Sequence, residues 1–450
     1  MLTSPGAYLL TLLLTSMLLS PCGGDVRVAS GESENTQGEE TPSDTSAESS
    51  DSVQLDDAIE TPPPSVEEPV PSRIVQRRDL PLVTPIGPEI TNHIIGIAGR
   101  AERSETVFAK MGGSSVESRA YLHCLSRDRD LELGEFEALR PTIERFRSPR
   151  VQGQTSFSRT SLAAQVGWSL RQGLTGRPSR IIQEARITNA RWALAFWGGN
   201  DVQGRNPRRY SERLLTMINQ LEGRGVVPVL AATTPRGDDE NMDKWARRYN
   251  QVTRGIAEAL ALPYIDFYTA IKALPNQGLA GDGVHPNVLL DGGRARACDF
   301  SEEGLQRGQN QRNLRTVQML QGLAAASRTP VELESRPEGD APLDITALPF
   351  AEVVQPSAAV LDGYSCAELS QQPGEEQVYR IEVDEAIALD FRVYRDDADL
   401  FYLGDSPEAS SCVASAHNEL SVVLTPGVHY VSVERAAESA PILIVDETIP

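Results

Sequence analysis

The sequence predicts an α/β domain with a mainly parallel sheet and helices on both faces, followed by a small all-β sandwich. Two observations lead to this prediction. Between residues 80 and 328, apolar segments of strand length alternate with helical segments, which is the pattern of parallel strands joined by helices. From residue 329 to 450, short segments alternate apolar and polar residues instead, which is typical of antiparallel strands.

Residues 1–22 resemble the signal peptide of a bacterial lipoprotein. An apolar run begins at residue 8 and ends near Cys22, and it is too short for a comfortable membrane span. Cys22 would be the lipidated residue after cleavage, although an ordinary secretory signal is an open alternative. We therefore expect either a cell-envelope lipoprotein, at the outer membrane or cell surface, or a secreted protein.

Residues 23–79 are expected to form a disordered acidic tether. The segment is rich in Ser, Thr, Pro, Asp and Glu, and it lacks the apolar side chains that would offset the entropy of ordering. The whole chain of 450 residues has a formal net charge of -21. This acidity argues against nucleic acid as a partner, because phosphate binding needs a basic face.

Residues 80–328 contain the segments of the predicted parallel sheet. The expected strands are 107–111, 192–197, 226–231 and 264–266. Helical spacing is expected from Val116 to Cys124, and over 134–146, 161–174, 210–222, 245–261 and 310–326. Binding sites in parallel sheets gather at the carboxyl ends of the strands, so polar motifs at those ends are candidates for function.

Residues 329–450 contain the expected strands 378–383, 388–393, 420–424 and 429–433. The region from Asp397 to Leu403, together with Cys412 and the last hairpin, looks similar to bacterial pre-peptidase C-terminal domains. This resemblance implies an accessory role in secretion or in attachment to a polymer. Asp396, Asp397 and Asp399 could bind calcium or could simply form a solvated turn.

Three polar motifs follow the predicted strands or lie in the loops beyond them. They are MGGSS at 111–115, GGND at 198–201 and GDGVHP at 281–286. A hydroxyl, an amide and an Asp/His pair in this order are the groups of an acyl-transfer site. Each motif also has a plainer interpretation, since glycine-rich segments with Ser, Asn or Asp often form turns after strands.

The chemistry gives each polar residue a role. Ser114 would be the nucleophile, and it needs an adjacent base because a free hydroxyl is too weakly acidic. His285 would take the proton and return it to the leaving group, while Asp282 would hold the imidazole in the correct tautomer. The Asn200 amide and the backbone N–H of Ser114 would stabilise the oxyanion.

Together the three motifs resemble the SGNH (GDSL-type) hydrolase family, over about residues 80–327. The resemblance implies a flavodoxin-like parallel sheet and a Ser-His-Asp triad with Asn in the oxyanion hole. The family's Gly-Asp-Ser is here Gly112-Gly113-Ser114, which leaves the adjacent Ser115 as a second candidate nucleophile. The family also has a glycine between the first two motifs. Residues 158–163 contain none, so the backbone N–H of Leu162 or Ala163 would replace it.

Four of the five cysteines remain once Cys22 is assigned to lipidation, and an even number in an exported protein suggests two disulfides. The predicted pairs are Cys124 with Cys298 and Cys366 with Cys412. Metal ligation is a weaker alternative, because the chain has no Cys-x-x-Cys and its histidines are scattered. No metal and no cofactor are expected.

The sequence thus predicts an exported serine esterase that hydrolyses carboxylic esters, with acyl groups on carbohydrate as one possible substrate class. The expected partners are a small ester or acylated glycan and, through the lipid anchor, a membrane; no protein partner is predicted. The alternative is a non-catalytic surface lipoprotein whose degenerate hydrolase domain binds glycan or displays the β-domain.

Overall fold

The computed structural model describes residues 74–76, 80–333, 342–355, 361, 363–366, 375–436 and 438–450. The predicted signal peptide, Cys22 and most of the predicted tether lie outside these residues. Within the described ranges, no helix combines the length and the apolar character that a membrane crossing would need.

A parallel sheet forms the centre of the first domain, as predicted. Its four strands lie in the order β2-β3-β4-β5, and all three strand pairs are parallel. Every residue of β3 and β4 is buried, which explains why these segments are apolar apart from Arg191, whose guanidinium donates to the carbonyls of Gly225 and Ala101. The strands are β2 (Ser104–Gly112), β3 (Ala190–Phe196), β4 (Val227–Ala231) and β5 (Tyr264–Ile265).

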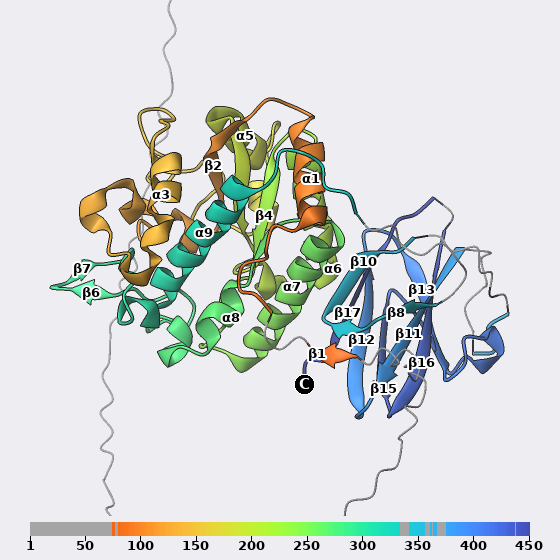
Figure 1. Cartoon of the computed structure of the whole chain (residues 1–450). Helices are drawn as coiled ribbons and strands as arrows, with labels where there is room; N and C mark the ends of the chain where they lie inside the picture. Colours follow the sequence, from red (N-terminus) through yellow and green to blue (C-terminus); the bar gives the residue numbers. More distant parts are fainter. Residues whose placement is uncertain are drawn as a thin grey trace, which may run out of the picture. The chain divides into compact units, whose positions relative to one another are not determined.

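Helices pack against this sheet, and Figure 1 shows them around it. Side chains cap the two long helices that follow β3 and β4. The Asn206 side chain accepts from the N–H of Arg209 at the start of α6. At the start of α7, the Asp239 side chain accepts from the N–H groups of Asn241 and Met242. The helices are α1 (Pro88–Ala98), α2 (Ser114–Glu117), α3 (Arg140–Arg147), α4 (Leu170–Gly173), α5 (Arg180–Thr188), α6 (Pro207–Glu222), α7 (Glu240–Ala259), α8 (Phe267–Lys272) and α9 (Gly308–Ala325).

Two of the predicted helices are wrong in extent. The helix expected from Val116 to Cys124 is only the single turn α2, because the chain becomes extended at Ser118, with φ -50° and ψ 134°. The helix expected over 161–174 is reduced to α4. Gly167 interrupts it with φ +76°, in the left-handed region that side chains rarely adopt. Both segments instead form loops beside the carboxyl end of the sheet.

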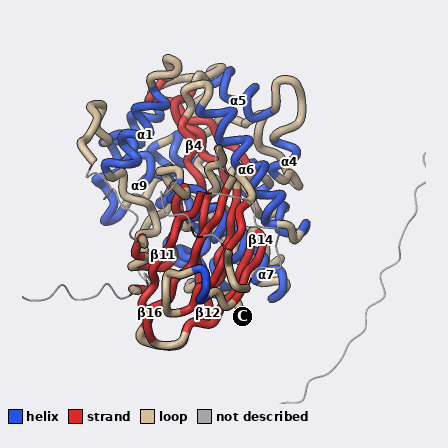
Figure 2. Tube along the Cα trace, turned by 90° about the vertical axis from the view of Figure 1, so that its right-hand side faces the viewer, coloured by secondary structure: helices blue, strands red, loops and turns tan. Residues whose placement is uncertain are grey.

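The C-terminal region is an all-β sandwich, as predicted. One sheet has the order β10-β17-β12-β15, and the other has the order β14-β13-β16-β11-β8. Figure 2 shows these strands in red, running alongside one another. The strands are β8 (Leu343–Asp344), β10 (Phe350–Val353), β11 (Glu375–Val383), β12 (Ile387–Tyr394), β13 (Ala398–Gly404), β14 (Ala414–His417), β15 (Glu419–Leu424), β16 (Gly427–Arg435) and β17 (Ile442–Glu447).

Residues 74–76, within the predicted tether, form backbone pairs with the sandwich, which differs from the disorder expected there. Strand β1 (Val75–Gln76) pairs in parallel with β9 (Ala347–Leu348), and the N–H of Ile74 donates to the carbonyl of Glu382 at 2.8 Å. These backbone bonds attach the segment to the sandwich. The chain then enters the α/β domain, so the sandwich contacts the chain on both sides of that domain.

Candidate active site

The turn after β2 brings Ser114 to the carboxyl end of the sheet. A Cβ atom on Gly112 would lie 2.5 Å from the carbonyl oxygen of Phe196, so only glycine allows β2 and β3 to approach so closely here. A Cβ atom on Gly113 would lie 3.1 Å from Asn200 Nδ2. The residue that replaces the family's Asp therefore lies directly against the predicted oxyanion amide.

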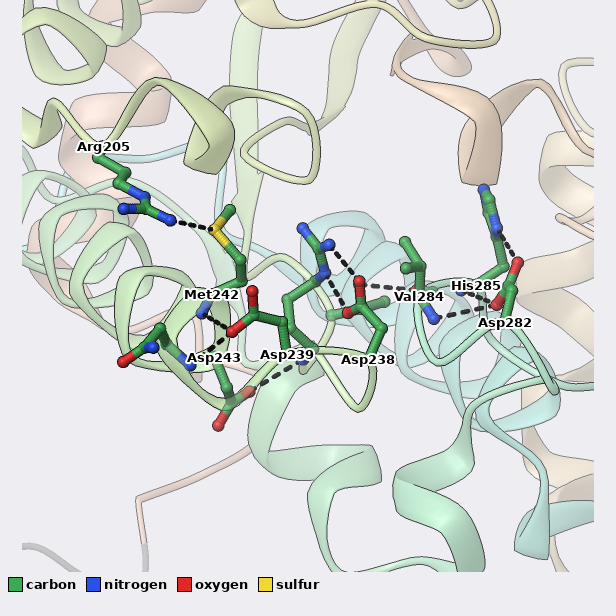
Figure 3. A network of polar contacts seen from close by, with 11 residues as sticks. Arg205, Asp238, Asp239, Met242, Asp243, Asp282, Val284 and His285 are labelled. Carbon is green, nitrogen blue, oxygen red and sulfur yellow. Dashed lines mark hydrogen bonds and ion pairs between the residues drawn. The ribbon is translucent and has the colours of Figure 1, made fainter.

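Ser114, His285 and Asp282 form a continuous chain of hydrogen bonds. Ser114 Oγ lies 2.8 Å from His285 Nε2, and His285 Nδ1 lies 2.6 Å from Asp282 Oδ2. Figure 3 shows Asp282 and His285 side by side on their loop. The carboxylate favours a proton on Nδ1, which leaves Nε2 as the acceptor that faces the serine. Of the two adjacent serines, Ser114 is the one whose hydroxyl contacts His285.

The Asp282 carboxylate is stabilised in its ionised form. Partial burial raises its pKa, but hydrogen bonds from the backbone N–H of His285, from the His285 ring and from the N–H of Val284 outweigh this effect. The net result is a pKa of about 2. Both N–H groups lie 3.0 Å from Asp282 Oδ1. Asp282 is therefore a fixed negative charge beside the imidazole at any physiological pH.

The loop after β4 lies beside the Asp282–His285 loop, as the labelled Asp238 and Val284 show in Figure 3. The N–H of Gly237 donates to the carbonyl of Gly283 at 2.8 Å, and Thr234 Oγ1 donates to the carbonyl of Val284 at 3.1 Å. Gly283 has φ +67°, and a Cβ atom on it would lie 2.6 Å from the backbone nitrogen of Asp238. The loop therefore needs glycine for its conformation and for its close packing.

Asn200 and Asp201 follow β3 and take different roles. Asn200 Nδ2 donates to the carbonyl of Trp168 at 2.9 Å, which fixes the amide beside Gly113. Asp201 is buried and accepts from the N–H groups of Gly198 at 3.2 Å and Leu170 at 3.1 Å. Burial raises the pKa of Asp201 despite these bonds. Its carboxylate holds the turn rather than facing the cavity.

The prediction that the backbone N–H of Leu162 or Ala163 would contact the oxyanion is wrong. The N–H of Leu162 donates to Glu184 Oε2 at 2.9 Å, and the N–H of Ala163 donates to Ser161 Oγ at 3.0 Å. Neither residue lines the cavity, whereas Gly167 does. The N–H of Gly167 makes no hydrogen bond within the described part of the chain. A glycine therefore does line the cavity, four positions beyond the segment 158–163 in which none was found. Its left-handed φ angle could not be inferred from the spacing of the motifs.

A cavity of about 210 Å³ lies against Ser114 and His285. Its walls are mainly aromatic and small apolar side chains, with Asn200 and Arg312 among the polar ones. The lining residues are Gly113, Ser114, Ser115, Val166, Gly167, Trp168, Phe196, Trp197, Gly198, Gly199, Asn200, Ala232, Thr233, Thr234, Phe267, Val284, His285 and Arg312.

The structure contains both disulfides in the expected pairing, Cys124–Cys298 and Cys366–Cys412. The first joins the segment after α2 to the segment after the Asp282–His285 loop. Across the described ranges, no group of three or more His, Cys, Asp and Glu side chains could hold a metal ion. In the sandwich, Asp397 pairs instead with Arg208, and Asp399 lies 2.8 Å from His417.

Residues 147–289 match the model of the GDSL-like lipase/acylhydrolase family. The match includes Asn200, Asp282 and His285 but begins after Ser114. No curated protein matches the chain.

Solved structures with similarity to the chain include a GDSL-like lipase from Bacteroides thetaiotaomicron, with 13% identity, coverage of 52% of this chain and 98% of that one, and a TM-score of 0.32. A lipolytic protein of the G-D-S-L family from Veillonella parvula has 17% identity and a TM-score of 0.30, and the match covers 47% of this chain and 96% of that one. A catalytic mutant of an acetylxylan esterase from Geobacillus stearothermophilus has 15% identity and a TM-score of 0.32, and the match covers 49% of this chain and 94% of that one.

Proposed function

We propose that this chain, which carries a domain of the GDSL-like lipase/acylhydrolase family, is a serine esterase that hydrolyses carboxylic esters. The observation that carries the proposal is the hydrogen-bonded chain from Ser114 through His285 to Asp282 at the wall of a cavity that Asn200 also lines. A hydroxyl, its base and the residue that orients the base meet within hydrogen-bond distance, as this chemistry requires.

In the first step, Ser114 Oγ attacks the ester carbonyl while its proton passes to His285 Nε2, which lies 2.8 Å away. Asp282 remains ionised and stabilises the imidazolium that forms. The negative charge moves to the former carbonyl oxygen. When the tetrahedral intermediate collapses, the bond to the alcohol breaks and the imidazolium gives its proton to the departing alkoxide.

The oxyanion would be stabilised by Asn200 Nδ2 and by the backbone N–H groups of Ser114 and Gly167. Asn200 uses one of its two amide protons on Trp168, which leaves the other for the substrate. Fixed donors of this kind stabilise the transition state without reorganising during the reaction. In the second step, water attacks the acyl-enzyme, His285 takes its proton, and Ser114 is released as the alcohol.

The proposed setting is the cell envelope, and acylated glycan is one proposed substrate class. Export is supported by the apolar segment that precedes Cys22, and anchoring is supported by that cysteine. The cavity volume of about 210 Å³ favours a short acyl group over a long fatty chain. The alcohol would remain in solvent, which suits a large polymeric alcohol.

Hydrolysis of 4-nitrophenyl acetate by the wild type, Ser114→Ala and Ser115→Ala tests the proposal. We expect Ser114→Ala to reduce kcat/KM by at least about a thousandfold, because the covalent route is lost. Ser115→Ala should retain most of the activity, since its hydroxyl does not contact His285. Equal rates for the wild type and Ser114→Ala would exclude catalysis by Ser114 and favour the non-catalytic alternative. The observation that favours this alternative is Gly113, which stands where the family has Asp.

A further inference from the structure

A buried cation lies in the cavity wall beside the nucleophile turn. Arg312 of α9 is only 2% exposed, yet its side chain lines the same cavity as Ser114. Its guanidinium carbon lies 4.4 Å from the ring centre of Tyr121 and 4.3 Å from that of Phe196. A third ring, Phe267, lies 5.3 Å away. These aromatic faces replace water around the cation and fix its position.

Arg312 has no counter-ion in the described part of the chain. Its only hydrogen bond there runs from Nη1 to the carbonyl oxygen of Ser115 at 2.8 Å, and its Nε has no partner. By contrast, the buried Arg159 and Arg392 are ion-paired with Glu184 and Asp390. The buried Arg191 has no ion pair in the described residues either, but its guanidinium donates to two carbonyls, and it lies away from the cavity. An unpaired buried charge is strongly destabilising, so such a group usually has a function.

The side chain also stays charged. Burial lowers the pKa of Arg312 to about 10, which leaves it protonated at neutral pH. A guanidinium has five N–H groups in a fixed fork, and the Ser115 carbonyl uses only one of them. A clamp on one neutral carbonyl would not need a permanent charge. Because Arg312 lines the cavity, its other N–H groups are donors suited to an anion or a strong acceptor in that cavity.

We propose that Arg312 makes the cavity select an acyl group with a terminal carboxylate, so that half-esters of short dicarboxylic acids are the preferred substrates. The inference rests on the proposed esterase function. The apolar walls, including Val166, Phe196 and Phe267, would contact the methylene groups between the two carboxyl carbons. The far carboxylate would accept hydrogen bonds from the guanidinium, which suits bidentate recognition of a planar anion.

The test compares ethyl hydrogen succinate with ethyl 4-methylpentanoate, a neutral ester of nearly the same acyl shape, by pH-stat titration. For the wild type, we expect kcat/KM to be at least about tenfold higher for the succinate, which corresponds to about 1.4 kcal/mol. Arg312→Met should lower this ratio by about tenfold or more, and Arg312→Lys should retain part of it. Arg315→Met removes a cation from the same helix but not from the cavity wall, so the ratio should stay unchanged.

A wild-type ratio of kcat/KM for the succinate to that for the neutral ester of one or less would overturn the inference. An Arg312→Met variant whose kcat/KM falls equally for the two esters would also overturn it. If Arg312→Met does not fold, competitive inhibition of wild-type hydrolysis of the neutral ester decides. Succinamate should inhibit at a much lower concentration than succinamide, which has the same carbon chain but no carboxylate, and equal inhibition would refute the preference. A wild type that hydrolyses neither ester would instead remove the proposed function itself, and the inference with it.

Discussion

The side chain of Ile444 in β17 fills the space that a Cβ atom on Gly255 in α7 would occupy. Such an atom would lie 2.4 Å from Ile444 Cδ1 and 2.6 Å from Cγ1. Ile444 is 1% exposed and belongs to the same apolar core as the strands of the parallel sheet. An ion pair between Arg248 and Glu419 also links α7 to the sandwich. The two parts of the fold therefore share a packed interface and are not merely tethered.

Gly255→Ala should lower the free energy of unfolding by about 1–3 kcal/mol, because the new methyl group would overpack this contact. Urea denaturation measures the change. The control is Gly96→Ala in α1, where nothing lies within 4 Å of the added atom. That variant should be neutral or more stable by up to about 1 kcal/mol, since alanine favours a helix. Equal changes in the two variants would contradict the interface.

Asn200→Ala should reduce kcat on a short ester by about a hundred- to a thousandfold with little change in KM. The reason is that the amide would contact the oxyanion in the transition state and not the substrate's ground state. Asn206→Ala is the control, because Asn206 caps α6 and lies outside the cavity wall. It should cost about 1 kcal/mol of stability and leave kcat nearly unchanged. A rise in KM at constant kcat for Asn200→Ala would assign the amide to substrate binding instead.

Lys110 in β2 should make the protein more stable as the pH rises above neutrality. Burial, opposed by Glu184, lowers the pKa of Lys110 to about 7, and its Nζ donates to the carbonyl of Phe157 at 2.9 Å. The unfolded chain keeps this proton up to about pH 10.4. Between these values the unfolded state binds more protons, so the free energy of unfolding rises with pH; below about pH 7 both states are protonated and the slope vanishes.

Urea midpoints from pH 6 to pH 10 measure this effect as the difference between the wild type and Lys110→Met. Taking the difference removes the contribution of the other titrating groups. We expect the wild type to gain stability relative to the variant across the upper part of this range. A constant difference between the two proteins would mean that the lysine keeps its ordinary pKa in the fold.

The strands of the parallel sheet could be predicted because each is mainly apolar, with Lys110 as the exception in β2, and such segments are buried on both faces. The predicted segments 107–111, 226–231 and 264–266 fall on β2, β4 and β5 within one residue at each end, apart from the longer start of β2. Ser114, Asn200 and His285 could be named as candidate site residues because each lies in a glycine-rich motif.

Other parts of the site depend on contacts between distant residues and leave no local signal. Arg312 lies in a helix whose sequence suggests nothing unusual, and its aromatic neighbours, Tyr121, Phe196 and Phe267, come from three separate segments. Gly167 was missed for a similar reason. Apolar residues around it have helical spacing, and that spacing reveals neither the left-handed φ angle of Gly167 nor the bridge between Ala164 and Gly112 at the end of β2.

The Cys124–Cys298 disulfide should support the geometry of the active site as well as stability. It joins residues 174 positions apart, and Asn313 Nδ2 reinforces the link by donating to the carbonyls of Ala120 and Ala297, each at 2.9 Å. Replacing both cysteines by serine should lower the free energy of unfolding by about 2–4 kcal/mol. When measured well below the melting temperature, kcat/KM should also be lower than that of the wild type, because the segments that follow Ser114 and His285 would move independently.

The Cys366–Cys412 pair gives the matched comparison, because it lies wholly within the sandwich region. Its double serine variant should lose stability but keep its kcat/KM at the same low temperature, since it touches neither the nucleophile turn nor the Asp282–His285 loop. Thermal melts and ester hydrolysis on both variants separate the two effects. If both variants kept full activity in the folded state, the first disulfide would stabilise the fold without positioning the site.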